Sequence, residues 1–212
     1  MKEKPNEWVS IADLMAGVMA VVMLLLVMSV LQKTYADQKH KKEMEKSVIA
    51  KKNKVTEVLN SLKDSVTKDG NNQLISFDID AGKVTLRDNV FERGSACITS
   101  EAKSAVGIFQ QKVSDFLLNV HGGQIFVEGH TDNLPVSKPV TDFSRFCTVY
   151  DDNFTLSAAR AREARKLLIG GLDAEVAKRI IVAGYGDSQP IVGIAAGDAK
   201  NRRVEIRFFV KQ

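Results

Sequence analysis

The feature that most constrains this chain is an apolar run near its N-terminus. Residues 11–31 read IADLMAGVMAVVMLLLVMSVL, with Asp13 as their single charge. As a helix this run spans roughly 30 Å, the thickness of a bilayer hydrocarbon core. A cleaved secretory signal is the alternative, with a poor cleavage site at 34–36, but the run is longer than a usual signal core and carries an acid. We therefore predict a transmembrane helix over 11–31, after a short tail over 1–10.

The lysines on the two sides of the run bear on the orientation of the chain in a membrane. Lys2 and Lys4 precede it, whereas four lysines follow it between residues 33 and 42. Counted literally, the positive-inside rule would place the C-terminal part in the cytoplasm. Large domains cross membranes largely regardless of such charges, so the count does not decide the orientation.

Residues 32–72 have the pattern of a helical linker. They are rich in lysine, and no proline or glycine occurs between residues 32 and 68. A thin apolar stripe recurs at helical spacing through Val48, Val55, Val58, Leu59 and Leu62. The pattern predicts either a solvated spacer, which the charge favours, or a weak coiled coil.

From residue 73 to 212 short apolar strands alternate with helical patterns. Strands are expected at 74–79, 83–87, 124–129, 179–186 and 202–210, and helices at 100–119, 156–169 and 173–178. The first two strands flank the turn at 80–82, as in a hairpin. This order predicts an α+β domain with its helices on one face of a sheet.

Composition and motif content exclude several kinds of site. Two cysteines cannot form a four-cysteine zinc site, and three scattered histidines are too few for a histidine-rich metal centre. A net charge of +4 and two adjacent arginines, Arg202 and Arg203, do not make a nucleic-acid-binding stripe. Ser157 and His130 lack the elbow motif of a nucleophilic enzyme. We expect no enzyme activity, no metal or cofactor, and no direct contact with nucleic acid.

Asp13 allows two interpretations. An acid inside a membrane span is costly and marks a functional site by default. Alternatively, Ser10 caps the helix and Asp13 favours its N-terminal dipole. Ala16, Gly17 and Ala20 lie on the Asp13 face and let another helix approach closely. This face favours a carboxyl group that gains and loses a proton beside a partner helix.

Four short motifs in the second half of the chain resemble the OmpA-like peptidoglycan-binding domain. They are Gly129-His130-Thr131-Asp132, Leu156-Ser157-Ala158-Ala159-Arg160-Ala161, Gly184-Tyr185-Gly186 and Asn201-Arg202-Arg203-Val204-Glu205-Ile206. The segment 91–96 also looks like that family, so the resemblance covers about residues 89–210.

The resemblance implies a site for a diamino acid of the cell-wall stem peptide. By motif match Asp132 pairs with the amine and Arg160 with the carboxylate, which suits an acid and a planar guanidinium. The neighbouring motif positions imply that Thr131, Leu156, Asn201 and Arg202 belong to the same site. Two features depart from the pattern: the loop 133–153 is long, and Gly197-Asp198 stands where many members have a Gly-Arg pair.

The N-terminal part resembles the flagellar stator subunit MotB. Residues 8–15 read WVSIADLM and are similar to the stretch around that family's ion-carrying aspartate, here Asp13. The short tail and the cysteine in the long loop are more similar to ZorB, the B subunit of Zorya anti-phage defence systems. The alternatives are a flagellar stator and a passive cell-wall anchor.

The resemblance to these B subunits implies an assembly and a location. It implies a homodimer with MotA- or ZorA-like membrane subunits, five per dimer, in the bacterial inner membrane. The N-terminus would be cytoplasmic and the C-terminal domain periplasmic, bound to peptidoglycan. In the oxidising periplasm Cys97 and Cys147 are expected to form a disulfide, whereas in a cytosolic protein both would be buried thiols.

Overall fold

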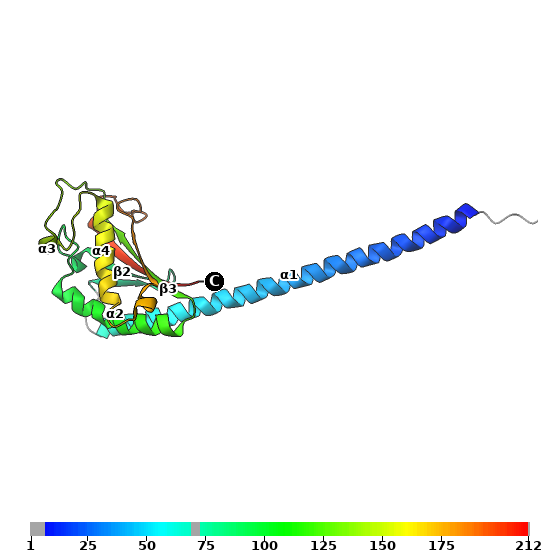
Figure 1. Cartoon of the computed structure of the whole chain (residues 1–212), viewed down its shortest axis with the longest axis horizontal. Helices are drawn as coiled ribbons and strands as arrows, with labels where there is room; N and C mark the ends of the chain where they lie inside the picture. Colours follow the sequence, from blue (N-terminus) through cyan, green and yellow to red (C-terminus); the bar gives the residue numbers. More distant parts are fainter. Residues whose placement is uncertain (1–6, 69–72, 212) are drawn as a thin grey trace, which may run out of the picture. The chain divides into compact units, whose positions relative to one another are not determined.

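The computed structural model describes residues 7–68 and 73–211 (Figure 1). The chain divides into two compact units, Met1–Ala50 and Lys51–Gln212. A single helix, α1 (Glu7–Lys68), begins in the first unit and ends in the second. Of the tail expected over 1–10, positions 1–6 lie outside the described residues and positions 7–10 belong to α1.

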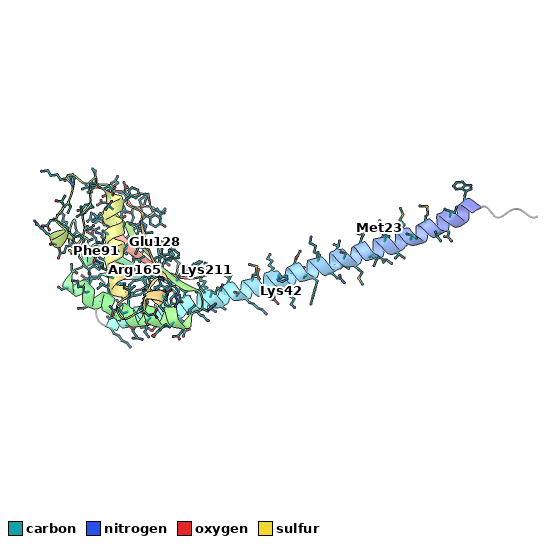
Figure 2. The ribbon with its side chains drawn as sticks, viewed as in Figure 1. Met23, Lys42, Phe91, Glu128, Arg165 and Lys211 are labelled. Atoms are coloured by element: carbon teal, nitrogen blue, oxygen red, sulfur yellow. A yellow bond between two sulfur atoms is a disulfide. The ribbon has the colours of Figure 1, made fainter. Side chains whose placement is uncertain are left out.

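The first unit is the exposed part of α1. Its side chains from residue 11 to residue 50 are all exposed, and Figure 2 shows Met23 and Lys42 projecting from the helix. Among the described residues, α1 is the one helix long and apolar enough to cross a membrane, with a mean hydropathy of 2.8 over its most apolar window. Ser10 already lies within α1, so it is not the N-cap, and Asp13 lies further from the helix end than expected.

The second unit begins earlier than the sequence pattern suggested. Val55, Leu59, Leu62 and Val66 of α1 are buried in the same core as the sheet. The expected domain boundary between residues 72 and 73 is therefore wrong, because the compact unit starts at Lys51. This part of α1 is held in the unit because each of its turns from Val55 to Val66 contributes one buried aliphatic side chain. The part of the linker over 32–50 is exposed at every position, as expected for a solvated spacer.

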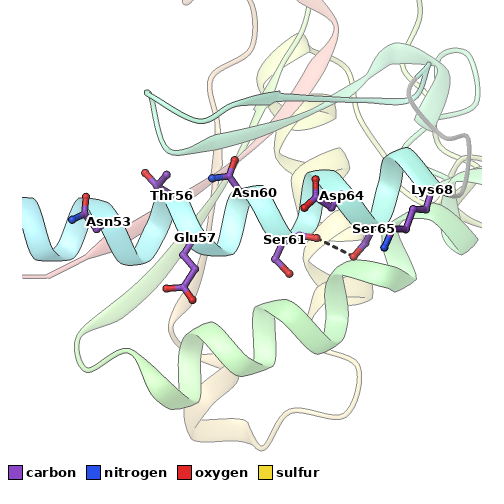
Figure 3. A pocket seen from close by; sticks show the side chains of 8 residues that line it. All are labelled: Asn53, Thr56, Glu57, Asn60, Ser61, Asp64, Ser65 and Lys68. Carbon is purple, nitrogen blue, oxygen red and sulfur yellow. Dashed lines mark hydrogen bonds between the residues drawn. The ribbon is translucent and has the colours of Figure 1, made fainter.

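The other side of this part of α1 is polar. Figure 3 shows the shallow groove that it lines, with Asn53, Thr56 and Asn60 on successive turns of the helix. Within the groove the Ser65 hydroxyl donates to the Ser61 carbonyl at 2.9 Å. The C-terminal part of α1 is thus amphipathic, with one buried side and one wet side.

The sheet of the second unit has five strands in the order β1-β2-β5-β3-β4. The strands are β1 (Ile75–Asp78), β2 (Lys83–Arg87), β3 (Gly123–His130), β4 (Ile180–Gly184) and β5 (Arg203–Val210). β3 and β4 are parallel and the other neighbours are antiparallel. The last strand, β5, therefore lies between β2 of the β1–β2 hairpin and β3.

Two long helices and several short ones complete the unit. They are α2 (Ser100–Asn119), α3 (Phe143–Phe146), α4 (Asn153–Leu168) and α5 (Ala174–Ala177), with 3₁₀ turns η1 (Asp88–Val90) and η2 (Ala199–Asn201). Thr99 caps α2, and Asp152 starts α4 earlier than expected by accepting from the Thr155 amide at 2.6 Å. The predicted fold class is confirmed, and α3 within the long loop is an addition.

The sheet has one apolar and one charged face because side chains alternate along each strand. Ile125 and Val127 of β3 belong to the hydrophobic core that the helices share. Glu128 and His130, which follow Val127 at alternate positions, belong to the other face, where Glu128 lies opposite Glu205 in the β3–β5 register.

Candidate functional site

Two motif glycines bring α4 directly against the ends of β3 and β4. A Cβ on Gly129 would lie 1.9 Å from the Ser157 carbonyl oxygen, and one on Gly184 would lie 2.6 Å from the Ala158 Cβ. Only glycine leaves room for this approach. It places Arg160, in the next turn of α4, near the residues that follow β3.

Ser157 holds the same junction together. Its hydroxyl donates to the Phe154 carbonyl at 2.8 Å and accepts from the Gly186 amide at 2.9 Å. Both contacts are with backbone groups, so the hydroxyl is engaged in structure. This arrangement gives no support to a nucleophile paired with His130.

Arg160 is the most deeply buried charge of the site, with 2% of its surface exposed. Its Nε donates to the Ser95 carbonyl at 3.0 Å, and its guanidinium carbon lies 5.3 Å from the centre of the Phe91 ring. Burial lowers the pKa of Arg160, while the nearby Asp88 carboxylate acts in the opposite direction. Within the described chain its Nη1 has no hydrogen-bond partner, because the Asp88 Oδ1 is 3.8 Å away. One donor of a buried cation is thus left without a partner among the described residues.

Arg202 connects two acids of the site. Its Nη2 donates to Asp88 Oδ2 at 2.8 Å and its Nη1 donates to Asp132 Oδ2 at 2.6 Å. The hydrogen bond to Asp88 is the main reason that the pKa of Arg202 is raised. Arg160, Asp88, Arg202 and Asp132 therefore form a row of alternating charges, which we call the ionic row.

The other expected site residues divide into two kinds. Thr131 is buried beside Asp132, and within the described chain its hydroxyl has no hydrogen-bond partner. Leu156 is buried in the first turn of α4 and supplies packing. Thr131 thus brings an unpaired polar group close to Asp132, whereas Leu156 contributes apolar packing at the start of α4.

Asn201 organises the loop between β4 and β5. Its Oδ1 accepts from the Ile191 amide at 2.8 Å, and its Nδ2 donates to the carbonyls of residues 195 and 196. The side chain is fully buried, and the partners of these three hydrogen bonds lie outside the ionic row. We therefore assign Asn201 a supporting role, in which it sets the position of the neighbouring Arg202.

A disulfide ties the long loop to the site. Cys97 and Cys147 are bonded, with Cα atoms 5.1 Å apart and a sequence separation of 50. Next to this bond the Ser95 hydroxyl and the Ala96 amide both donate to the Phe146 carbonyl at 3.0 Å. The loop is therefore fixed beside Ser95, whose carbonyl oxygen holds Arg160.

Sequence reasoning missed Asp88. This residue begins η1 and contacts both arginines of the ionic row. It lies one position before the segment in which the motif resemblance begins, so no motif pointed to it. The sequence signal that could have identified Asp88 as a site residue is its position directly after β2 and shortly before the aromatic Phe91.

The charged face of the sheet carries a second cluster. Ligand atoms of Glu128, His130 and Glu205 lie within 4.8 Å of one another, and all three residues are buried. Glu205 already accepts from Arg203 at 2.7 Å and from Lys83 at 3.1 Å. Arg207 donates to Glu128 at 2.8 Å, so three cations compensate two carboxylates. A divalent cation would be repelled here, and the cluster is better explained as a buried ion-pair network.

His130 is neutral within that network. Burial, followed by the Arg203 charge, lowers its pKa to about 4. Its ring stacks on Tyr185 with centroids 5.3 Å apart, and within the described chain neither ring nitrogen has a hydrogen-bond partner. His130 thus acts as a packed aromatic ring that positions the following Thr131 and Asp132.

Known proteins share this fold and parts of this sequence. Motility protein B of Bacillus subtilis is 31% identical over 128 residues, which are 58% of this chain and 43% of that protein, so the chain spans less than half of that relative. Zorya protein ZorB of Escherichia coli is 26% identical over 223 residues, covering 99% of this chain and 89% of ZorB. The chain is thus related to motility protein B and to ZorB.

A solved structure and a family model support the same relationship. The cell wall anchor of the T6SS from Pseudomonas aeruginosa is 31% identical, with a TM-score of 0.51 over 72% of this chain and 97% of that one. The OmpA family model matches residues 90–203, which include Asp132, Arg160 and Arg202 of the ionic row. Since this match covers more than half of the sequence, the chain belongs to the OmpA family.

Proposed function

We propose that this chain is the membrane-anchored B subunit of a stator-like, proton-driven complex that binds peptidoglycan and serves in Zorya-type anti-phage defence. The similarity to ZorB supports this assignment because it extends over nearly the whole chain, including the apolar part of α1. In this proposal the chain has no enzyme activity and needs no cofactor.

The ionic row carries the cell-wall part of the proposal. A free end of a diamino acid presents one carboxylate and one ammonium close together. The carboxylate can accept from the free Nη1 of Arg160, and the ammonium can pair with Asp132 in place of Arg202. The Thr131 hydroxyl is available to either group. A zwitterion therefore fits the alternating charges without leaving a buried charge unpaired.

Asp13 carries the proton-driven part. It is exposed on α1, and the small residues Ala16, Gly17 and Ala20 follow it at helical spacing. We propose that two copies of the chain pair inside a ring of five MotA- or ZorA-like membrane subunits. The N-terminus would lie in the cytoplasm and the second unit in the periplasm, where the disulfide is stable.

Retention on purified peptidoglycan sacculi tests the binding site. We expect Asp132→Ala and Arg160→Ala each to abolish retention of the full chain in detergent about as strongly as both together, because each leaves one charge of the bound zwitterion unpaired. Lys166→Ala, on the exposed side of the same helix, is the matched control and should bind normally. Unchanged retention of the double variant would remove the cell-wall assignment.

Phage protection tests the proton-carrying role. In cells that carry the chain with its neighbouring genes, Asp13→Asn should keep membrane insertion and assembly and lose protection. Asp37→Asn, on the same helix beyond the apolar run, should protect like the parent.

A passive cell-wall anchor is the second candidate, favoured by the similarity to the T6SS anchor. It predicts that Asp13→Asn is fully active. Gene neighbourhood distinguishes a flagellar role from a defence role. In the flagellar case, flagellar genes would lie beside this gene instead of defence genes.

A further inference from the structure

A second cavity lies directly beside the ionic row. It has a volume of about 380 Å³ and shares Asp88 and Arg202 with the row. Arg87 from the end of β2 and Lys200 from η2 also line it. A ligand held at the ionic row therefore has an open, adjoining space into which it can extend.

The described lining of this cavity is strongly cationic. It contains four cations, Arg87, Lys200, Arg202 and Arg203, and a single acid, Asp88. Arg202 and Arg203 are engaged with carboxylates inside the protein. Arg87 and Lys200 have no carboxylate within 4.0 Å among residues 7–68 and 73–211, and both are exposed. Neutral hydrogen-bonding side chains, Ser76 and Thr85, lie on the strands beside them. The cavity thus presents two uncompensated cations and several polar groups, which suits an anionic group.

We propose that this cavity binds a second carboxylate of the same cell-wall peptide whose diamino acid occupies the ionic row. The inference rests on the proposed function of Asp132 and Arg160. Successive peptide residues are about 3.5 Å apart, so a carboxylate one or two residues along the stem lies about 4–7 Å from the diamino acid. That reach matches a cavity that starts at Asp88 and Arg202.

Arg202 couples the two positions. It pairs with Asp132 in the ionic row and also lines the cavity. When a ligand ammonium takes its place on Asp132, one Nη group of Arg202 becomes available to the second carboxylate. The two groups of one ligand therefore assist each other, and the site favours stem peptides whose carboxylate is free over those in which it is amidated.

The test compares two soluble probes and a matched set of variants of the full chain in detergent. The probes are a muramyl tripeptide that ends in the diamino acid, with its glutamate carboxylate either free or amidated. The variant is Arg87→Gln with Lys200→Gln. The control is Lys63→Gln with Lys103→Gln, which removes the same charge at exposed positions outside the cavity.

We expect the parent to bind the free-carboxylate probe roughly tenfold more tightly than the amidated one, because an amide forms no ion pair with Arg87 or Lys200. The Arg87 and Lys200 variant should lose this preference while it binds the amidated probe like the parent. The control should keep the preference. Equal affinity of the parent for both probes, or an unchanged preference in the variant, would overturn the inference. Failure of the parent to bind either probe would instead overturn the proposed function.

Discussion

Arg202 donates to Asp132 at 2.6 Å, so a cation of the protein itself occupies the acid that is proposed to hold a ligand ammonium. The same guanidinium reaches Asp88 at 2.8 Å. Arg202 is therefore an internal counterpart of the proposed ligand ammonium. This keeps the Asp132 carboxylate, of which 7% is exposed, from being buried without a counter-charge.

Replacing Arg202 should lower the stability of the domain. Arg202→Gln leaves Asp88 and Asp132 without their shared cation, and we expect the free energy of unfolding to fall by about 1–3 kcal/mol. Urea denaturation of the fragment 51–212 measures the change. Lys178→Gln, which breaks an exposed pair with Glu175, should cost less than about 1 kcal/mol. Equal losses in the two variants would argue against a special role for Arg202.

The junction of α4 with β3 should tolerate no side chain at Gly129. Gly129→Ala would push a methyl group into the Ser157 backbone, and we expect a loss of roughly 3 kcal/mol or more. Gly107→Ala is the control, since it adds a methyl group to α2 where nothing lies within 4 Å. This change should stabilise the helix by about 1 kcal/mol. Thermal unfolding of both variants distinguishes these opposite outcomes.

The Cys97–Cys147 bond should be a major contributor to stability. It closes a loop with a sequence separation of 50, which is worth roughly 4 kcal/mol in the chain-entropy model. We expect reductant to lower the urea midpoint of the parent fragment to that of the double Cys→Ser variant. Thiol labelling of unreduced, denatured protein should find no free cysteine. Two labelled cysteines would refute the bond and weaken the periplasmic assignment.

His130 should make the domain less stable in mild acid. Its pKa is about 4 in the folded state and 6.5 in the unfolded chain, so the unfolded state binds an extra proton as the pH falls through this window. The contribution of His130 to the free energy of unfolding is therefore fully present above pH 6.5 and is lost as the pH falls towards 4. Between pH 7 and pH 5 the free energy of unfolding should fall by about 2 kcal/mol. His130→Gln should remove this part of the pH dependence. If His130→Gln keeps the full pH dependence of the free energy of unfolding, other titrating groups cause that dependence.

The C-terminal part of α1 should stabilise the domain. Leu59→Ala removes a fully buried side chain from the shared core and should cost about 2–5 kcal/mol. Asn60→Ala, on the exposed groove of the same helix in Figure 3, should have little effect. Fragments that start at residue 73 should unfold at lower urea than fragments that start at Lys51. Indistinguishable midpoints would mean that α1 only rests on the domain.

Much of the fold followed from local pattern. The period of apolar residues predicted α2 at 100–119 and β2 at 83–87 with the bounds that the structure shows. These elements could be predicted because helix and strand periods, turn glycines and capping side chains act over only a few residues. The same locality explains the error at α1, where a lysine-rich helix with a thin stripe looked like a spacer.

The candidate site shows most clearly which features could be predicted from the sequence and which depended on the tertiary structure. The motif order pointed to Asp132 and Arg160, and the apolar run with its single acid pointed to Asp13. Only the tertiary structure brought Asp88 between Arg160 and Arg202, placed Arg202 on Asp132, and opened a cationic cavity beside them. The hydrogen bonds of Arg202 join residues 70 and 114 positions apart, and such pairings depend on how strands and helices pack and not on any local period. Local chemistry in the sequence determined which residues can carry charge and span a membrane, whereas packing of distant segments decided which of those charges meet.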